Sequence, residues 1–187
     1  MKDKLTQQSI SLFDEKGFSE TSIQDIVDAL GVTKGTFYYY FSSKEELLMD
    51  IQLAYIDDIL SHQERILLDS TKNCKDKLFE IVYLLIRNIE RQGASAKVFF
   101  REMRHLNEER LNEIIPKRDQ FRKNVETLIN QGMGNGEFRT DLNARIVTFG
   151  LLGMTNWSYQ WFNPSSQLTD KELSEIYLEM VLNGISK

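Results

Sequence analysis

Apolar residues recur at helical spacing along almost the whole chain. Their period of three to four residues is that of an amphipathic helix, and no run alternates with the period of two that marks a strand. Hydroxyl residues and glycines stand between the periodic segments, where they suit helix starts and helix ends. The pattern predicts an all-α protein of about nine helices. We expect these helices over residues 5–16, 22–30, 33–40, 43–67, 76–91, 94–104, 116–132, 141–157 and 169–184.

The expected helices differ in length between the start of the chain and the rest. The first three are short and separated by tight turns, whereas the later ones are mostly long, and 187 residues can hold a small domain joined to a larger one. We predict a three-helix N-terminal helix-turn-helix domain over residues 1–46 and a larger C-terminal helical bundle over residues 47–187. Residues 146–157 are apolar on every side, so we expect neighbouring elements to enclose that helix.

The composition is that of an ordinary globular protein, with 41% hydrophobic and 27% charged residues. Cys74 is the only cysteine, so neither an intramolecular disulfide nor a cysteine cluster for zinc can form. No stretch approaches the run of about 18 apolar residues that a membrane helix requires, and the N-terminus lacks the apolar core of a signal peptide. We therefore expect a cytoplasmic protein with no cofactor, no metal and no membrane partner.

The net charge of −5 argues weakly against a nucleic-acid partner, because proteins that bind phosphates usually carry a basic surplus. The distribution of charge is more informative than the sum. The first fifty residues hold five lysines against nine acidic residues, a net charge of −4, but residues 29–44 contain two lysines and no acid. Residues 87–123 hold ten lysines and arginines against six acidic residues, a local charge of +4. Two basic neighbourhoods therefore interrupt an acidic chain.

Residues 22–30 and 33–40 have the size of a helix-turn-helix, in which two short helices are joined by a turn that contains glycine. In such a motif the N-terminal residues of the second helix contact base edges and phosphates. Lys34 can donate to guanine, and Thr36 can contact a base or a thymine methyl group. A short helix pair is more often a plain packing unit, but three consecutive tyrosines on an acid-free helix favour DNA binding, since their hydroxyls suit phosphate oxygens. The expected core of this unit comprises Ile23, Ile26, Val27, Leu30, Val32, Phe37 and Phe41.

Residues 31–41 read GVTKGTFYYYF and are followed by Ser43, Lys44, Glu45 and Leu47. This run resembles the signature of the TetR family of bacterial transcriptional regulators, and the likeness extends without a gap over residues 10–48. The resemblance implies an all-helical homodimer that binds double-stranded DNA through its N-terminal domain and a small ligand through the domain behind it. It places the DNA contacts at Ser22, Gln24, Thr33, Lys34, Gly35, Thr36, Tyr38, Tyr39, Tyr40 and Lys44.

Residues 136–139 read GEFR and residues 151–157 read LLGMTNW, with Trp161 and Phe162 beyond them. These segments resemble the subgroup of the family that responds to acyl-CoA thioesters. An acyl-CoA needs an apolar tunnel for its chain and cations, preferably arginines, for its phosphates. Such residues are more often plain core or a solvated face, and an unrelated hydrophobic ligand stays an alternative. The candidate ligand-binding residues are Phe99, Phe100, Arg101, Arg104, Phe121, Arg122, Phe149, Met154, Trp157 and Trp161.

The last expected helix has one apolar face. Together with the apolar helix at 146–157 it presents more apolar surface than a chain of this size can cover, so we expect both to pair with their copies in a homodimer. The candidate interface residues are Leu173, Tyr177, Met180 and Val181.

The main hypothesis is a ligand-responsive DNA-binding transcriptional regulator, a repressor that an acyl-CoA or similar hydrophobic ligand releases from a palindromic operator. The first rival is a helical interaction protein whose helix-turn-helix does not bind DNA, and the acidic first fifty residues favour it. An enzyme is not expected. Glu102 and His105 have the spacing used in di-iron bundles, but such sites need two copies, and the chain has no glycine-rich phosphate loop or nucleophile elbow.

Overall fold

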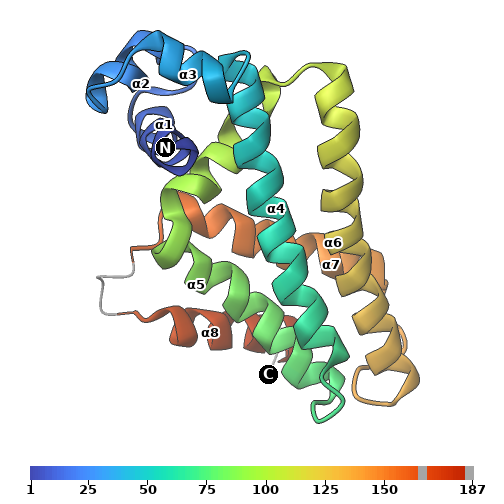
Figure 1. Ribbon diagram of the computed structural model, residues 1–187. Coiled ribbons are helices and arrows are strands. Elements are labelled where there is room, and N and C mark those ends of the chain that lie inside the picture. The colour runs from blue at the N-terminus through green and yellow to red at the C-terminus, as the bar shows by residue number, and fades with distance from the viewer. Residues whose placement is uncertain (164–167, 184–187) are drawn as a thin grey trace. The chain divides into compact units, whose positions relative to one another are not determined.

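The computed structural model describes residues 1–163 and 168–183, and every regular element among them is a helix. Figure 1 follows the helices in chain order from blue to red. Two short 3-10 helices, η1 (Met103–His105) and η2 (Ser158–Gln160), accompany the α-helices. The all-α prediction is therefore confirmed for the described residues. The eight α-helices described are α1 (Lys2–Lys16), α2 (Ile23–Ala29), α3 (Lys34–Tyr40), α4 (Lys44–Leu68), α5 (Cys74–Arg101), α6 (Glu108–Gly134), α7 (Ala144–Trp157) and α8 (Asp170–Asn183).

The helices expected at 76–91 and 94–104 are both present as the two segments of α5, which meet at a kink. The backbone leaves helical geometry at Gln92, with φ −141° and ψ 33°, and then returns to it. The break lies one residue before Gly93, the glycine at which the sequence predicted that the first of the two segments ends. The side-chain amide of Gln92 donates to the Asp58 carboxylate at 3.3 Å, which holds the kink against α4.

Helix α6 begins at Glu108, eight residues before the predicted start at Pro116. Asn107 provides the N-terminal cap, since its side-chain oxygen accepts the backbone N–H of Arg110 at 3.0 Å. Pro116 lies inside the helix, where its ring removes one backbone hydrogen bond. Helix α7 starts in a similar way at Ala144, because the side chain of Asn143 accepts the N–H of Ile146 at 3.1 Å. Gly184, the predicted end of the last helix, lies outside the described residues.

The chain divides into two compact units. Unit 1 comprises residues 1–57 and 94–115, and unit 2 comprises residues 58–93 and 116–187. Helices α4, α5 and α6 each contribute a segment to both units, so the units are not successive stretches of chain. The functional domain boundary between residues 46 and 47 stays a prediction.

The interior of unit 1 is built around α1, α2 and α3. Four of the seven predicted core residues, Ile26, Val27, Phe37 and Phe41, are buried, and the other three are half-buried. The Phe37 and Phe41 rings lie 5.8 Å apart. Other fully buried side chains of unit 1 include Leu5, Phe13, Leu47, Leu48, Val98 and Ile114.

Unit 2 has an aliphatic interior with one buried polar link. The Gln63 amide of α4 donates to the backbone carbonyl of Phe121 at 3.0 Å, and its oxygen accepts from Asn124 at 2.7 Å. Both polar atoms of the buried amide are therefore satisfied, which avoids the cost of an unpaired buried group. The surrounding apolar side chains include Ile81, Val82, Ile86, Val125, Leu128 and Leu151.

Helix α7 is not enclosed by the rest of its chain, contrary to the sequence prediction. One face, which includes Thr148, Leu151 and Thr155, is buried, and α7 packs on α8. The opposite face leaves Ile146 and Trp157 each 64% exposed. The prediction treated residues 146–157 as apolar on every side, so it did not indicate that one face of α7 is exposed.

Candidate nucleic-acid interface

The turn between α2 and α3 is a tight glycine turn. Gly31 has φ +63°, a left-handed conformation that residues with a side chain adopt only with strain. The N–H of Val32 donates to the carbonyl of Val27 at 2.9 Å, and the N–H of Gly31 donates to that of Asp28 at 3.1 Å. This bonding pattern ends α2 and turns the chain directly into α3. The local sequence therefore specifies the helix-turn-helix geometry.

Both helices of the motif begin at a hydroxyl cap, as predicted. Ser22 and Asp25 form a capping box, in which each side chain accepts the other's backbone N–H, at 2.7 and 3.1 Å. The hydrogen bonds from the Ser22 hydroxyl and N–H lower the pKa of Asp25. Thr33 caps α3 by accepting the N–H of Thr36 at 3.4 Å. Ser22 and Thr33, two of the ten predicted DNA contacts, thus also fix where α2 and α3 begin.

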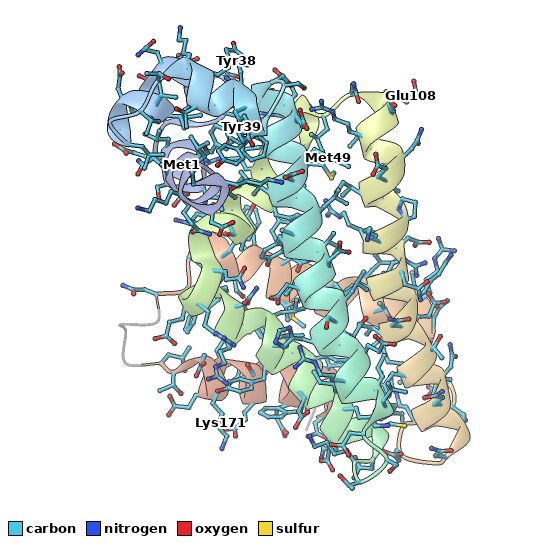
Figure 2. All side chains as sticks on the ribbon, viewed as in Figure 1. Met1, Tyr38, Tyr39, Met49, Glu108 and Lys171 are labelled. Atoms are coloured by element: carbon cyan, nitrogen blue, oxygen red, sulfur yellow. The ribbon has the colours of Figure 1, made fainter. Side chains whose placement is uncertain are left out.

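The outer face of α3 is free of acidic side chains and largely exposed. Tyr38 is 54% and Tyr39 80% exposed, and Figure 2 labels both on α3. Lys34 and Gly35 are also exposed, whereas Thr36 and Tyr40 are half-buried. A Cβ at Gly35 would touch only the Thr33 hydroxyl, at an ordinary 3.5 Å. Packing within the chain does not require glycine here, which favours a close approach by something outside it.

Gln24 is exposed on α2 and its side-chain amide donates to the Asp28 carboxylate at 2.6 Å. The pair is one helical turn apart and lies at the surface, so water competes for it. This hydrogen bond uses one amide proton of Gln24, so the second proton and the amide oxygen can still contact a base.

Lys44 differs from the other predicted DNA contacts because it is anchored inside unit 1. Its ammonium donates to the carbonyls of Phe18 and Thr21, both at 2.6 Å, and lies 4.3 Å from the Phe18 ring centre. Burial lowers the pKa of Lys44. An ammonium has three protons, so this arrangement leaves one for a phosphate. Lys44 therefore holds the loop before α2 in place whether or not it contacts DNA.

Four of the candidate ligand-binding residues belong to unit 1. Phe99 is buried with its ring 4.7 Å from that of Tyr55, and Phe100 packs edge-on against Phe99. Arg101 donates to Glu102 at 2.7 Å and to the backbone carbonyls of Phe13 and Asp14. The guanidinium of Arg101 therefore binds the last turn of α1. Sequence reasoning missed this role, which no local signal indicates.

Arg104 is exposed, and its side chain lies 3.3 Å from the His105 ring nitrogen. His105 in turn stacks on Phe18, with ring centres 5.1 Å apart, and approaches Glu102 at 3.4 Å. The 3-10 helix η1 therefore packs beside the loop that follows α1.

The other six candidate ligand-binding residues belong to unit 2. Arg122 pairs with Asp119 at 2.7 Å and with Glu126, and these two hydrogen bonds raise the pKa of Arg122. Its guanidinium carbon lies 5.4 Å from the ring centre of Phe149. Phe121 is buried, Met154 is half-buried, and Phe149, Trp157 and Trp161 are exposed. The ten candidates are thus divided between the two units, and their common role stays a prediction.

The candidate interface residues of α8 point in different directions. Leu173 is only 2% exposed and packs inside unit 2, and the Tyr177 hydroxyl lies 2.8 Å from that of Ser158. Met180 is 45% exposed and Val181 is half-buried. Exposed Ile176 lies on α8 with Met180, but the sequence did not distinguish the outer face from the inner one.

Among the described residues, no helix has the length and hydropathy of a membrane span. Nor do histidine, cysteine, aspartate and glutamate side chains in this part of the chain gather into a group that could hold a metal ion.

The exposed, acid-free helix of a properly capped helix-turn-helix defines a candidate DNA-binding protein, and comparison with known proteins gives its family. The family described as "Bacterial regulatory proteins, tetR family" matches residues 5–51, and "Tetracyclin repressor-like, C-terminal domain" matches residues 71–185. The HTH-type transcriptional repressor KstR2 of Mycobacterium tuberculosis is 30% identical over 186 residues, covering 98% of this chain and 92% of KstR2. The chain therefore belongs to the TetR family of transcriptional regulators.

Solved structures agree with this assignment. The ketosteroid transcriptional regulator KstR2 of M. tuberculosis has a TM-score of 0.88 at 29% identity, covering 100% of this chain and 95% of that chain. PfmR of Thermus thermophilus has a TM-score of 0.90 at 27% identity, with coverage of 98% and 99%. AibR, solved in complex with isovaleryl coenzyme A and operator DNA, has a TM-score of 0.87 with 97% coverage of both chains. Its identity is 23%, so the likeness to AibR shows a shared fold.

Lys44→Met should lower the free energy of unfolding by about 1–2 kcal/mol, because two hydrogen bonds from a charged donor are lost. Urea denaturation followed by circular dichroism measures this change. Lys34→Met is the matched control, since exposed Lys34 makes no hydrogen bond or ion pair within the described structure. Equal stability of the two variants would contradict the anchoring role of Lys44.

Proposed function

We propose that the protein is a homodimeric transcriptional repressor whose α3 helices bind a palindromic operator, and that a hydrophobic effector, specifically an acyl-CoA thioester, releases it. The observation that carries the DNA-binding part is the outer face of α3, which is acid-free, exposed and held in place by caps at both helix starts. A DNA-binding domain over residues 1–46 accounts for this face. The net negative charge of residues 1–46 does not oppose the proposal, because the acidic side chains of that segment lie on elements other than α3.

Within this proposal the residues of α3 have two roles. Lys34 and Thr36 lie in the first turn, where a recognition helix contacts base edges, and Gly35 lets the helix backbone approach the DNA. Tyr38, Tyr39 and Tyr40 follow, and their hydroxyls suit phosphate oxygens, which orient the protein without reading sequence. Ser22, Gln24, Thr33 and Lys44 complete the proposed contact set.

Lys34→Ala should weaken operator binding by about 1–3 kcal/mol and relax the sequence preference at one position, because a base contact is lost. Fluorescence anisotropy with a labelled palindromic fragment from upstream of the gene, at several salt concentrations, measures affinity and salt slope. Lys4→Ala, which removes an exposed lysine of α1, is the control and should change neither. If wild type shows no salt-dependent binding to any such fragment, the interaction-protein rival replaces the repressor proposal.

The dimer is proposed on the exposed apolar faces of α7 and α8. These two helices pack on each other, and they leave Ile146, Phe149, Trp157, Ile176 and Met180 exposed. Apolar side chains gathered on neighbouring helices mark an interaction surface, and a two-fold axis lets one such surface cover its own copy. A repressor of a palindrome needs that symmetry.

Met180→Glu should convert the dimer to monomers and abolish operator binding, because a carboxylate buried across the axis has no partner. Sedimentation velocity at micromolar concentration measures the assembly. Glu179→Gln, a neighbouring exposed position, is the control and should leave the dimer intact. A wild-type protein that sediments as a monomer would overturn the dimer proposal.

The acyl-CoA assignment rests on the segments 136–139 and 151–157 and on the basic surplus over residues 87–123. The AibR structure, which contains isovaleryl coenzyme A, supports a CoA thioester as effector, and the name of KstR2, a ketosteroid regulator, supports a hydrophobic effector of a different kind. An unrelated hydrophobic molecule is therefore the second candidate. Among the proposed ligand residues, Arg104 is the arginine least engaged in ion pairs, whereas Arg101 and Arg122 must first leave their carboxylates.

Palmitoyl-CoA should lower operator affinity by about tenfold or more, within the usual coupling of about 1–3 kcal/mol between two sites. An anisotropy titration compares palmitoyl-CoA and isovaleryl-CoA with palmitate and free CoA, while the fluorescence of Trp157 and Trp161 reports binding. Release by palmitate alone, or no response to either thioester, would contradict the acyl-CoA assignment and leave the repressor proposal intact.

A further inference from the structure

Unit 2 contains a pocket that none of the candidate ligand-binding residues lines. It has a volume of about 470 Å³, within the range of about 300–1,000 Å³ that is usual for small-molecule sites. The start of α5, the end of α6, the start of α7 and the end of α8 surround it. Its apolar walls are Leu78, Ile129, Phe138, Leu142, Val147, Val181 and Leu182.

The pocket owes its shape to the turn after α6. Gly136 has φ +77°, and the N–H groups of Glu137 and Phe138 both donate to the carbonyl of Gly132, at 2.8 and 3.1 Å. This turn folds Phe138 back against α6. A Cβ at Gly132 would lie only 2.3 Å from the Phe138 ring, so glycine is required there for the ring to form the pocket wall.

Three charged side chains line the same pocket, Lys75, Glu137 and Arg139. Glu137 is already committed, since its carboxylate accepts the N–H of Lys75 at 3.0 Å. Burial works to raise the pKa of Glu137, but hydrogen bonds from the backbone of Lys75 and Cys74 outweigh it and lower the pKa. The charge of this carboxylate is thus used to cap the start of α5.

Compared with Glu137, the cationic side chains of Lys75 and Arg139 are available to bind a ligand. Arg139 lies 3.4 Å from Asp141, but both side chains are more than 70% exposed, so water screens the pair. Lys75 is exposed and has no ion-pair partner within the described structure. An apolar pocket with two cations at its edge complements a molecule that has an apolar body and one negative end, and an arginine fork suits a carboxylate in particular.

We propose that this pocket binds an amphipathic carboxylate, with the apolar body against Val147 and Leu142 and the carboxylate between Lys75 and Arg139. None of the ten candidate ligand-binding residues lines the site, although its residues Glu137, Phe138 and Arg139 belong to the segment 136–139 that supports the acyl-CoA proposal. It does not depend on the regulatory function, since binding to unit 2 requires neither DNA nor release.

Isothermal titration calorimetry of the full-length protein with decanoate, in the absence of DNA, tests the proposal. Decanol has the same apolar chain without the charge, and it should bind at least about fivefold more weakly, because it loses a charge-assisted hydrogen bond. In the double variant Lys75→Gln/Arg139→Gln the two molecules should bind alike. Lys171→Gln, an exposed cation of α8 outside the pocket, is the control and should preserve the difference.

Val147→Trp fills the pocket and should abolish decanoate binding, with Leu142→Trp as a second variant should the first not fold. Circular dichroism melting checks folding, and operator binding is measured in parallel so that a loss of DNA binding is seen separately. Three results would overturn the proposal: no binding of decanoate to wild type, unchanged binding in the folded tryptophan variant, or equal affinity of wild type for decanoate and decanol.

Discussion

The backbone carbonyls at the end of α1 and in the loop after it need hydrogen-bond donors, and two cations from distant helices supply them. A helix leaves its last carbonyls without intrahelical partners, and the negative end of its dipole attracts positive charge. Arg101 from the end of α5 donates to two carbonyls in the last turn of α1, and Lys44 from the start of α4 donates to two in the loop. Since this loop leads directly into Ser22, the cations hold the start of α2 in place, together with the buried side chains of Ile26 and Val27.

Local signals predicted the helix-turn-helix well, because its geometry depends on neighbours in the chain. Ser22, Gly31 and Thr33 act over three to five residues, through two caps and one left-handed turn. The roles of Arg101 and Lys44 depend on partners 88 and 26 residues away, so spacing alone could not distinguish an arginine that binds a carbonyl from one that awaits a phosphate. The distribution of charge indicated cations over residues 29–44 and 87–123, but it did not indicate which groups these cations contact.

Helix boundaries and faces in the second half of the chain show the same limit. Pro116 fits a first helical position as well as any residue, yet the cap at Asn107 starts α6 earlier, and the helix tolerates the missing hydrogen bond. The prediction that α7 is enclosed rested on its apolar residues alone, and it did not identify the side that packs inward. The buried side of α7 carries Thr148 and Thr155. Each threonine hydroxyl donates a hydrogen bond to a backbone carbonyl one turn earlier in the helix. Ile146 and Trp157 remain outside and available to a partner.

A ligand changes operator affinity only if it binds one conformation of the protein more tightly than another. Helices α4, α5 and α6 each run through the boundary between the two units, and α5 is interrupted close to that boundary by the non-helical Gln92. Helix α5 ends in Arg101, which holds α1. A ligand that favours one geometry of the Gln92 kink therefore acts on the same helix that supplies the donors for the α1 carbonyls.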